Sequence, residues 1–284
     1  MRKNRREFRK ASADHAWGGS LLAAAGAVRR PADPSGKQTR SVTVALVQFD
    51  SVPAQVAGNL DQMERLAGEA ARSGARWILF HELTVCDYAD RPEEMAEPVP
   101  GGSSTRRMIR LAGRLQTFIA FGLAEKDRGR IYDSVVLVGP RGYLYHYRKT
   151  WLWFMRSDEG YRDEWARFDP GTGPELFSLD GVRATCFICA DSNSRRCMER
   201  AVALKPQVVL FPINRVMVSS HEEYGAIARK IGAPMLVANR VGRSVAKDTL
   251  GGCVVSSPGG KIPAIANMDG RKEILLHRLH LAAI

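Results

Sequence analysis

Short apolar runs alternate along this chain with longer segments in which apolar residues recur at helical spacing. The first run, Val42–Gln48, is rich in β-branched residues and predicts a buried strand. Residues 59–72 then place Leu60, Met63 and Leu66 on one face, which predicts an amphipathic helix. Strand and helix patterns that alternate in this way are typical of an α/β domain in which helices cover a sheet.

The same alternation continues to the end of the chain. Further strands are expected at residues 77–80, 118–123, 132–138, 143–148, 176–179, 182–189, 208–211, 234–239, 252–256 and 272–279, and further helices at 103–115, 196–204 and 222–231. No internal repeat and no linker-like segment follow Ser41. Residues 41–284 are therefore expected to form one layered α/β domain.

The positive charge of the chain is concentrated near its N-terminus. The net charge of the whole chain is +12, and the first 40 residues contribute ten Lys or Arg against three Asp or Glu. The rest of the chain therefore carries about +5, which does not favour nucleic acid as a partner, although a basic nucleic-acid binder stays an alternative. No uncharged apolar stretch approaches the ~18 residues of a spanning helix, so stable membrane insertion is not expected.

Residues 1–40 are expected to be a leader and a linker rather than part of the fold. Asn4–Lys10 contains an arginine pair followed by a phenylalanine and a lysine, and resembles a twin-arginine export signal. A weakly hydrophobic segment follows, in which Ala25 and Ala27 offer an Ala-x-Ala cleavage site. The sequence thus predicts periplasmic export of a folded protein. The alternative is a disordered basic tail on a cytoplasmic enzyme.

The five cysteines are too few and too scattered for a disulfide scaffold. Cys186, Cys189 and Cys197 could suggest a zinc site, but no fourth ligand follows at the spacing typical of zinc fingers. No metal is therefore expected. An odd number of cysteines with one in a distinctive position fits a catalytic thiol.

Chemically useful side chains follow the ends of three apolar runs. Glu82 comes after residues 77–80, Lys149 closes residues 143–148, and Cys189 ends residues 182–189. Open α/β sheets place their sites at such strand ends. The thiol would be the nucleophile, the carboxylate its base, and the ammonium a positive charge that stabilises the negative charge formed in the reaction. Taken singly, the charged residues also fit a solvated surface, and the cysteine fits the core.

The order and spacing of these residues resemble the carbon–nitrogen hydrolase family, also called the nitrilase superfamily. The motifs are Glu82-Leu-Thr, Tyr147-Arg-Lys149, Glu164 ahead of Pro170-Gly, Ile188-Cys-Ala-Asp191 and Ala238-Asn-Arg-Val-Gly242, and they span about residues 41–260. The resemblance implies an αββα sandwich that forms a homodimer or larger homo-oligomer, with no metal and no organic cofactor. It also implies a triad of Glu82, Lys149 and Cys189, with Glu164 as a second glutamate.

The resemblance further implies hydrolysis of a non-peptide C–N bond in a small-molecule amide or carbamoyl compound. A thiol of reference pKa ~8.5 is a poor nucleophile until it is deprotonated, and Glu82 is the expected general base. Lys149 and the backbone N–H of Ala190 would stabilise the oxyanion. Glu164 would orient the substrate nitrogen or hold Lys149. Nitrile hydrolysis, acyl transfer and a catalytically silent binding protein stay open as alternatives.

Several positions depart from the family pattern. His81 stands where members commonly have proline, and Trp151 stands where they commonly have histidine. Both are expected to contact substrate, with a purely structural role as the alternative. True nitrilases typically carry Trp-Glu after the cysteine, whereas Ala190-Asp191 is similar to the amide-cleaving branches. An amidase or carbamoylase is therefore preferred to a nitrile hydrolase.

Overall fold

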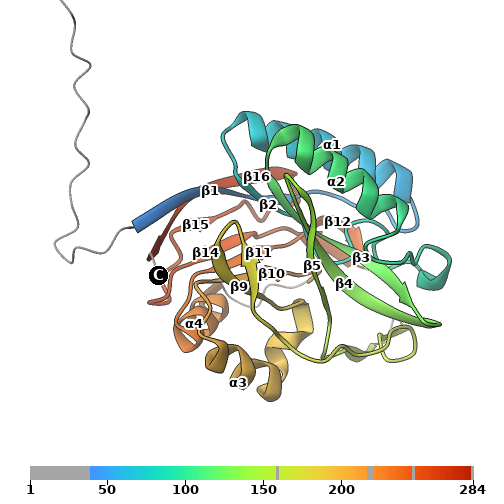
Figure 1. Ribbon diagram of the computed structural model, residues 1–284. Coiled ribbons are helices and arrows are strands. Elements are labelled where there is room, and N and C mark those ends of the chain that lie inside the picture. Colours follow the sequence, from blue (N-terminus) through green and yellow to red (C-terminus); the bar gives the residue numbers. More distant parts are fainter. Residues whose placement is uncertain (1–38, 158–159, 216–220, 245–246, 283–284) are drawn as a thin grey trace, which may run out of the picture. The chain divides into compact units, whose positions relative to one another are not determined.

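The computed structural model describes residues 39–282, apart from residues 158–159, 216–220 and 245–246 (Figure 1). The chain divides into two units, Met1–Lys37 and Gln38–Ile284, and the second is the one described here. The predicted leader, residues 1–40, lies outside the described residues except for Thr39 and Arg40. These two already belong to the first strand rather than to a linker. In the described part of the chain, no helix is long and apolar enough to cross a membrane.

Two six-stranded sheets form the centre of the domain. The first has the order β16-β1-β2-β3-β4-β5, with β1, β2 and β3 parallel and the others antiparallel to their neighbours. Its strands are β1 (Thr39–Gln48), β2 (Trp77–Leu79), β3 (Phe118–Asp127), β4 (Arg130–Gly139), β5 (Gly142–Arg148) and β16 (Glu273–Ala282). Its parallel centre follows from the alternation of strands and helices in the first half of the chain.

The second sheet has the order β15-β14-β11-β10-β9-β8. Its strands are β8 (Phe177–Leu179), β9 (Val182–Cys186), β10 (Val208–Pro212), β11 (Met235–Ala238), β14 (Val254–Ser256) and β15 (Ala264–Ile265). Strands β9, β10 and β11 are parallel, and the outer strands are antiparallel to their neighbours. Each sheet therefore has a parallel centre whose strand ends are available for a site.

Helices cover the outer face of each sheet (Figure 1). The helices α1 (Val56–Arg72) and α2 (Ser103–Leu115) lie on the first sheet, and α3 (Arg195–Leu204) and α4 (His221–Ile231) lie on the second. Alternate residues of β1 explain the layering: Val44 and Leu46 pack between the sheets, whereas Ala45 and Val47 pack against α1 and α2. The result confirms the predicted αββα sandwich.

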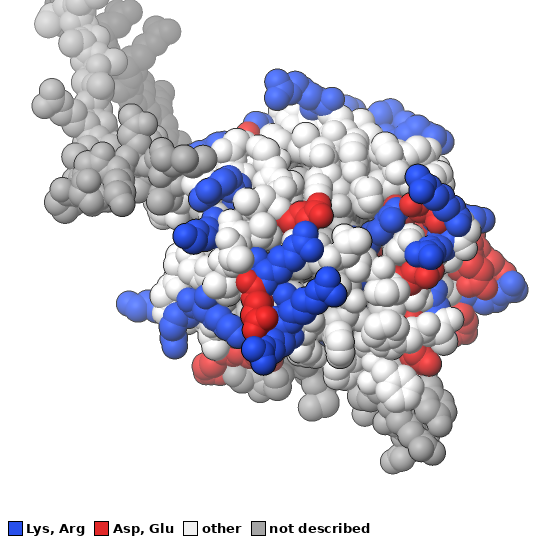
Figure 2. Space-filling model, turned by 60° about the horizontal axis from the view of Figure 1, so that its bottom comes forward, with Lys and Arg blue, Asp and Glu red and all other residues white. Residues whose placement is uncertain are grey.

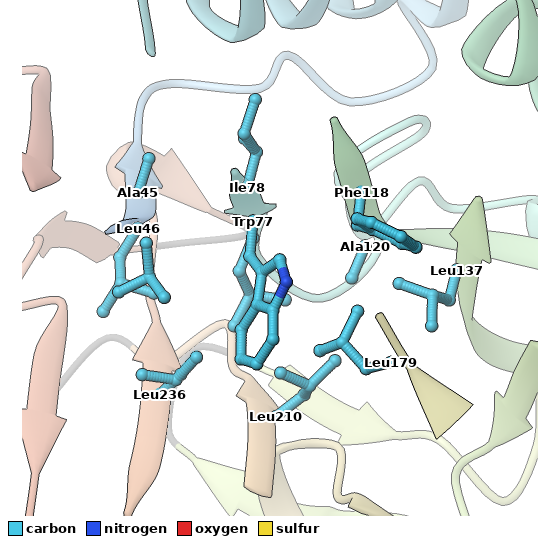
Figure 3. Close-up of a pocket in the computed structure, with 12 residues that line it drawn as sticks. Ala45, Leu46, Trp77, Ile78, Phe118, Ala120, Leu137, Leu179, Leu210 and Leu236 are labelled. Atoms are coloured by element: carbon cyan, nitrogen blue, oxygen red, sulfur yellow. The ribbon is translucent and has the colours of Figure 1, made fainter. Parts of the chain in front are cut away.

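The inner faces of the two sheets enclose a small apolar pocket (Figure 3). Leu46, Trp77 and Leu137 line it from the first sheet, and Leu210 and Leu236 line it from the second. None of the lining residues is a predicted site residue. The pocket therefore belongs to the hydrophobic core of the sandwich and not to the candidate active site.

The outer surface over α3 and α4 carries charges of both signs (Figure 2). Arg195 pairs with Glu199 one helical turn later, at 2.7 Å, and Arg200 reaches Glu175 at 3.4 Å. Exposed pairs of this kind contribute little to stability, so this face is held to the sheet by its buried apolar side.

Most predicted elements agree with the observed ones, and the differences lie at a few places. Strand β9 ends at Cys186 rather than Cys189, and a short 3-10 helix, η2 (Cys189–Asn193), begins at Cys189. The cause is local: the backbone N–H of Ile188 donates to the side chain of Asp191 (2.9 Å), which turns the chain out of the sheet.

Two hairpins, the short edge strand β15 and a short 3-10 helix were not predicted. The hairpin of β6 (Phe154–Ser157) and β7 (Gly160–Asp163) falls in a stretch for which no strand was predicted. A second hairpin joins β12 (Val241–Ser244) to β13 (Lys247–Leu250), and η1 (Pro92–Glu94) is a 3-10 turn. Both hairpins lie outside the two large sheets, so their sequences lack the apolar alternation that marks a half-buried strand.

Candidate active site

Four segments that follow strands bring the predicted catalytic residues together. Glu82 lies three residues after β2, Lys149 directly after β5, and Glu164 directly after β7, while Cys189 begins η2. All four side chains are buried. The structure thus collects three charged groups and a thiol, far apart in the sequence, at one place in the domain.

The ammonium group of Lys149 is the centre of this cluster. Its Nζ lies 2.5 Å from Oε1 of Glu82, 2.7 Å from Oε2 of Glu164 and 3.4 Å from Oδ2 of Asp133. Burial lowers the pKa of Lys149, but the charges of Glu164 and Glu82 outweigh it and hold the pKa well above its ordinary value. Lys149 is therefore a fixed positive charge that does not titrate near neutral pH.

Glu164 is held from three directions. Its Oε1 accepts a hydrogen bond from the Tyr88 hydroxyl (2.6 Å), and its Oε2 accepts one from the backbone N–H of Trp153 (2.6 Å) as well as contacting Lys149. A carboxylate with this many donors is pinned in one orientation. The arrangement suits the predicted role of Glu164 in holding Lys149.

Cys189 occupies a backbone conformation that favours glycine, with φ of +42°. Strained residues of this kind cluster at functional sites, where the surrounding structure holds them in place. Burial and the nearby charge of Glu82 raise the pKa of the Cys189 thiol to about 11, while Lys149 and Arg215 act in the opposite direction. The thiol is thus uncharged at neutral pH in the free protein, and its attack on a substrate needs a base.

Asp191 links the two segments that carry the lysine and the cysteine. Its Oδ1 accepts hydrogen bonds from the backbone N–H groups of Thr150 (2.9 Å) and Trp151 (2.7 Å). Its Oδ2 accepts from the N–H of Ile188 (2.9 Å) and from the hydroxyl of Tyr147 (2.8 Å). Burial raises the pKa of Asp191 to about 6, although these hydrogen bonds lower it. One buried carboxylate therefore fixes the spacing between the two catalytic segments.

Arg215 lies three residues after β10 and contacts the backbone of Cys189. Its Nη2 donates to the backbone oxygen of Cys189 (3.1 Å) and to Oγ of Ser192 (2.8 Å), and its Nη1 lies 3.2 Å from Glu223. The predicted site did not include Arg215. It follows the apolar strand 208–211 closely, so the strand-end rule that marked Lys149 could also have marked this arginine.

Asp133 is a second residue that the sequence reasoning missed. It lies within β4, and its side chain is fully buried beside Lys149. The signal was a single carboxylate inside the apolar run 132–138, a position that a strand normally reserves for a core residue.

His81 lies beside Glu82 and is fully buried. Its Nδ1 is 2.9 Å from the backbone oxygen of Glu82, and its ring packs against Phe49 with centroids 5.3 Å apart. Burial and the charge of Arg240 lower the pKa of His81 to about 4, so the imidazole is neutral at physiological pH. These contacts position the loop that carries Glu82. Contact of His81 with substrate stays a prediction.

Trp151 and Ala190 flank the catalytic segments. Trp151 is 44% exposed and meets Trp165 edge to face, with ring centroids 6.3 Å apart. Ala190 is buried in η2 next to Cys189. Their predicted roles, a substrate contact for Trp151 and an oxyanion donor for the backbone of Ala190, remain predictions.

A buried arginine ties together the loops beneath the site. Arg240 is fully buried and contacts Asp87, and it also lies 2.6 Å from Asp50. Asp87 in turn accepts a hydrogen bond from Asn214 (2.8 Å). Loops that follow β1, β2, β10 and β11 are therefore joined through one guanidinium group.

The described residues also bear on metal binding. Among them, no group of three or more His, Cys, Asp or Glu side chains is arranged to hold a metal ion. The carboxyl groups that converge in the candidate site do so around the Lys149 ammonium.

Comparison with known proteins places this chain in a family. Residues 43–284 match the family model for carbon–nitrogen hydrolases. A protein named nitrilase from Pyrococcus abyssi is 30% identical over 80% of this chain and 85% of its own length. An N-carbamoylputrescine amidase from Oryza sativa subsp. japonica is 27% identical over 86% of this chain and 87% of its own length.

Solved structures share the fold. The structure of a cysteine-to-alanine mutant of the Nesterenkonia AN1 amidase, from the nitrilase superfamily, superposes with a TM-score of 0.73. It is 21% identical in sequence, and the match covers 84% of this chain and 90% of that one. At this identity the likeness concerns the arrangement of sheets and helices.

Proposed function

This chain belongs to the carbon–nitrogen hydrolase family and is an enzyme, and we propose that it cleaves an amide or N-carbamoyl C–N bond through an acyl-cysteine intermediate. One observation carries the proposal. The buried ammonium of Lys149 lies between Glu82 and Glu164, and the charges of Glu82 and Lys149 act on the thiol of Cys189, whose backbone is strained. A base, a fixed positive charge and a thiol are the parts that acyl transfer to cysteine needs.

In the first step, Glu82 removes the proton of Cys189 as the sulfur attacks the substrate carbonyl carbon. The thiol has a pKa of about 11, so base assistance during attack is favoured over a preformed thiolate. Negative charge develops on the substrate oxygen, where Lys149 and the N–H of Ala190 stabilise it. Losing one donor of this kind typically costs ~2.7–4 kcal/mol of transition-state stabilisation.

In the second step, protonated Glu82 returns the proton to the substrate nitrogen, and the C–N bond breaks. An amine or ammonia leaves, and a thioester remains on Cys189. Glu82 then takes a proton from water, which attacks the thioester carbon. The acid is released, and the proton returns to the sulfur, so the enzyme is regenerated without a cofactor in these steps.

The names of the relatives support amide or carbamoyl substrates. They include the rice N-carbamoylputrescine amidase and an (R)-stereoselective amidase from Pseudomonas sp. that is 28% identical over 64% of this chain. A second candidate is nitrile hydrolysis, because the Pyrococcus abyssi relative is named nitrilase. The same thioester could also be passed to an amine, which would make the reaction an acyl transfer.

The thioester itself tests these possibilities. The full-length protein is mixed with amides, N-carbamoyl compounds and nitriles, quenched in acid and measured by intact mass. We expect an added mass equal to the acyl or carbamoyl group, absent in Cys189→Ala. An adduct that persists in Cys189→Ala, or turnover that persists in folded Cys189→Ala, would overturn the cysteine mechanism. An adduct from nitriles alone would favour the second candidate.

A homodimer or larger homo-oligomer also remains part of the proposal. Light scattering coupled to size-exclusion chromatography measures the mass of the particle in solution. A mass near 31.4 kDa, that of one chain, would contradict it.

A further inference from the structure

Asp133 is a buried carboxyl group to which the reaction steps above assign no role. Its side chain is fully buried, and its Oδ2 lies 3.4 Å from Nζ of Lys149. Its backbone oxygen accepts the backbone N–H of Lys149 at 2.8 Å. Asp133 therefore touches the catalytic lysine twice, once through its backbone and once through its side chain.

The charges around Lys149 do not balance if every carboxyl group is ionised. Glu82, Glu164 and Asp133 converge on a single ammonium group, in a cluster whose side chains are at most 3% exposed. Three negative charges against one positive charge would leave a net negative charge with almost no water to solvate it. Sites that crowd carboxylates in this way normally retain a proton on one of them.

The hydrogen bonds indicate where that proton lies. Glu164 accepts from Tyr88 and Trp153, and Glu82 accepts from Lys149. No donor in the described part of the chain reaches either carboxyl oxygen of Asp133 with hydrogen-bond geometry.

The contact between Asp133 and Glu82 also indicates that one of the two carboxyl groups is protonated. The two carboxyl groups are within hydrogen-bonding reach of each other. Two ionised carboxylates have no proton to share, so this contact is a hydrogen bond only when one of them is protonated.

We propose that Asp133 is a positioning residue: it stays protonated at neutral pH and donates a hydrogen bond to Glu82, which holds the general base in place. The inference rests on the proposed function, because it takes Glu82 as the base. Lys149 and Asp133 then hold the Glu82 carboxylate from two sides. The site carries one ammonium and two carboxylates, with one neutral acid.

The surroundings of Asp133 favour its neutral form. Burial and the charge of Glu82 raise the pKa of Asp133 well above its ordinary value, and Glu164 adds to the effect, while Lys149 opposes it. Other titratable groups that interact with Asp133 include the thiols of Cys86 and Cys186. Burial raises the pKa of both thiols, that of Cys86 to about 12, so neither adds a charge at neutral pH.

Infrared spectroscopy tests the protonation state without any substrate. A protonated carboxylic acid has a carbonyl stretch separate from the carboxylate bands. The difference spectrum of wild type minus Asp133→Asn at pH 7, with aspartate labelled with carbon-13, should contain this band shifted by the isotope. A difference spectrum that contains only carboxylate bands overturns the proposal. Because this readout needs no turnover, its result is independent of whether the proposed function holds.

The pH dependence of Cys189 acylation tests the positioning role. An amide at position 133 can donate to Glu82 as the acid does, so Asp133→Asn should acylate within about threefold of wild type and keep the acidic limb of the pH–rate profile. Asp133→Ala loses the donor, so it should be slower by about tenfold and have its acidic limb at higher pH.

If Asp133 were ionised instead, Asp133→Asn would remove a negative charge beside Glu82. The acidic limb would then move to lower pH by about one unit. That shift, or an equal loss of rate in folded Asp133→Asn and Asp133→Ala, overturns the proposal. Asp191→Asn serves as a matched control, because Asp191 accepts four hydrogen bonds and its replacement should not be tolerated.

Discussion

The Nζ of Lys149 lies 2.5 Å from Oε1 of Glu82, and neither side chain is exposed to solvent. A buried pair of this kind is costly to break, because removing one partner leaves the other charge without compensation. It also means that the base and the positive charge act as a unit. Variants at these positions must therefore be examined for folding as well as for rate.

Glu82→Gln is expected to abolish efficient acylation while Cys189 remains present. The amide cannot accept the thiol proton, and general-base catalysis typically contributes about 10²–10⁴-fold. Rapid-quench intact mass measures thioester formation, and circular dichroism checks that the variant is folded. Cys189→Ser, which keeps the nucleophile position but weakens the nucleophile, is the companion control. Acylation of folded Glu82→Gln at the wild-type rate would contradict the role of Glu82.

Arg215→Met is expected to make the Cys189 thiol less acidic. Arg215 lowers the pKa of Cys189, so its removal should push that pKa above about 11. Between pH 7 and 10, alkylation by iodoacetamide follows the thiolate fraction, and a shift of one pKa unit means about a tenfold slower reaction at a given pH. Intact mass follows the reaction, with Cys189→Ala to identify the site.

An exposed arginine provides the control for this prediction. Arg195 is 89% exposed at its side chain and pairs only with Glu199 among the described contacts. Arg195→Met should alkylate at the wild-type rate at every pH. Equal alkylation rates in Arg215→Met and wild type would show that Arg215 does not act on the thiol.

Much of the fold is predictable because buried strands and helices place apolar residues at regular spacings in the sequence. Val44, Ala45, Leu46 and Val47 face two different cores in turn, so all four are apolar. A strand that is covered on both faces requires such a continuous apolar run. The hairpin of β6 and β7 shows no such pattern of apolar residues, because it lies outside the large sheets.

The candidate site was only partly predictable for a related reason. Glu82, Lys149 and Cys189 were found because each follows an apolar run and because their order resembles a known family. Asp133 and Asp191 act through contacts between segments that are distant in the sequence. A single sequence does not reveal which buried carboxylate will face which donor, so such positioning residues emerge only from the structure.

Asp191→Asn is expected to loosen both catalytic segments. The amide has only one acceptor oxygen, and its NH₂ group cannot accept a hydrogen bond. The NH₂ group would therefore face another donor, either the backbone N–H of Ile188 or that of Trp151, and the hydrogen bond from that N–H would be lost. Hydrogen bonds to a charged group contribute about 1.5–3 kcal/mol each, so the loss should lower both the free energy of unfolding and the acylation rate. Urea denaturation and thioester formation measure the two effects.

The same variant should also change how stability depends on pH. Burial raises the pKa of Asp191 to about 6 from 3.8, so the folded state binds this proton more tightly than the unfolded state. The stability contributed by the protonated group is therefore lost as the pH rises from about 4 to 6. The difference in unfolding free energy between wild type and Asp191→Asn should narrow over that range. A constant difference would contradict the assignment.

The predicted leader can be tested apart from the enzyme. Residues 1–40 fused to a reporter that works only after folded export should deliver that reporter through the twin-arginine route. Changing Arg5 and Arg6 to lysine should abolish delivery, because the export route recognises the arginine pair. No export of the fusion, or export that is unaffected by these changes, would contradict the twin-arginine signal.

Arg240→Met is expected to destabilise the domain without changing a contact of Cys189. The substitution leaves Asp87 fully buried without its guanidinium partner, and breaking such a pair typically costs about 3–5 kcal/mol. Chemical denaturation measures the loss in unfolding free energy. The matched control is Arg271→Met, which breaks a surface pair with Asp269 whose side chains are 77% and 47% exposed. An exposed pair contributes at most about 1 kcal/mol, so equal effects of the two substitutions would show that Arg240 does not hold the loops together.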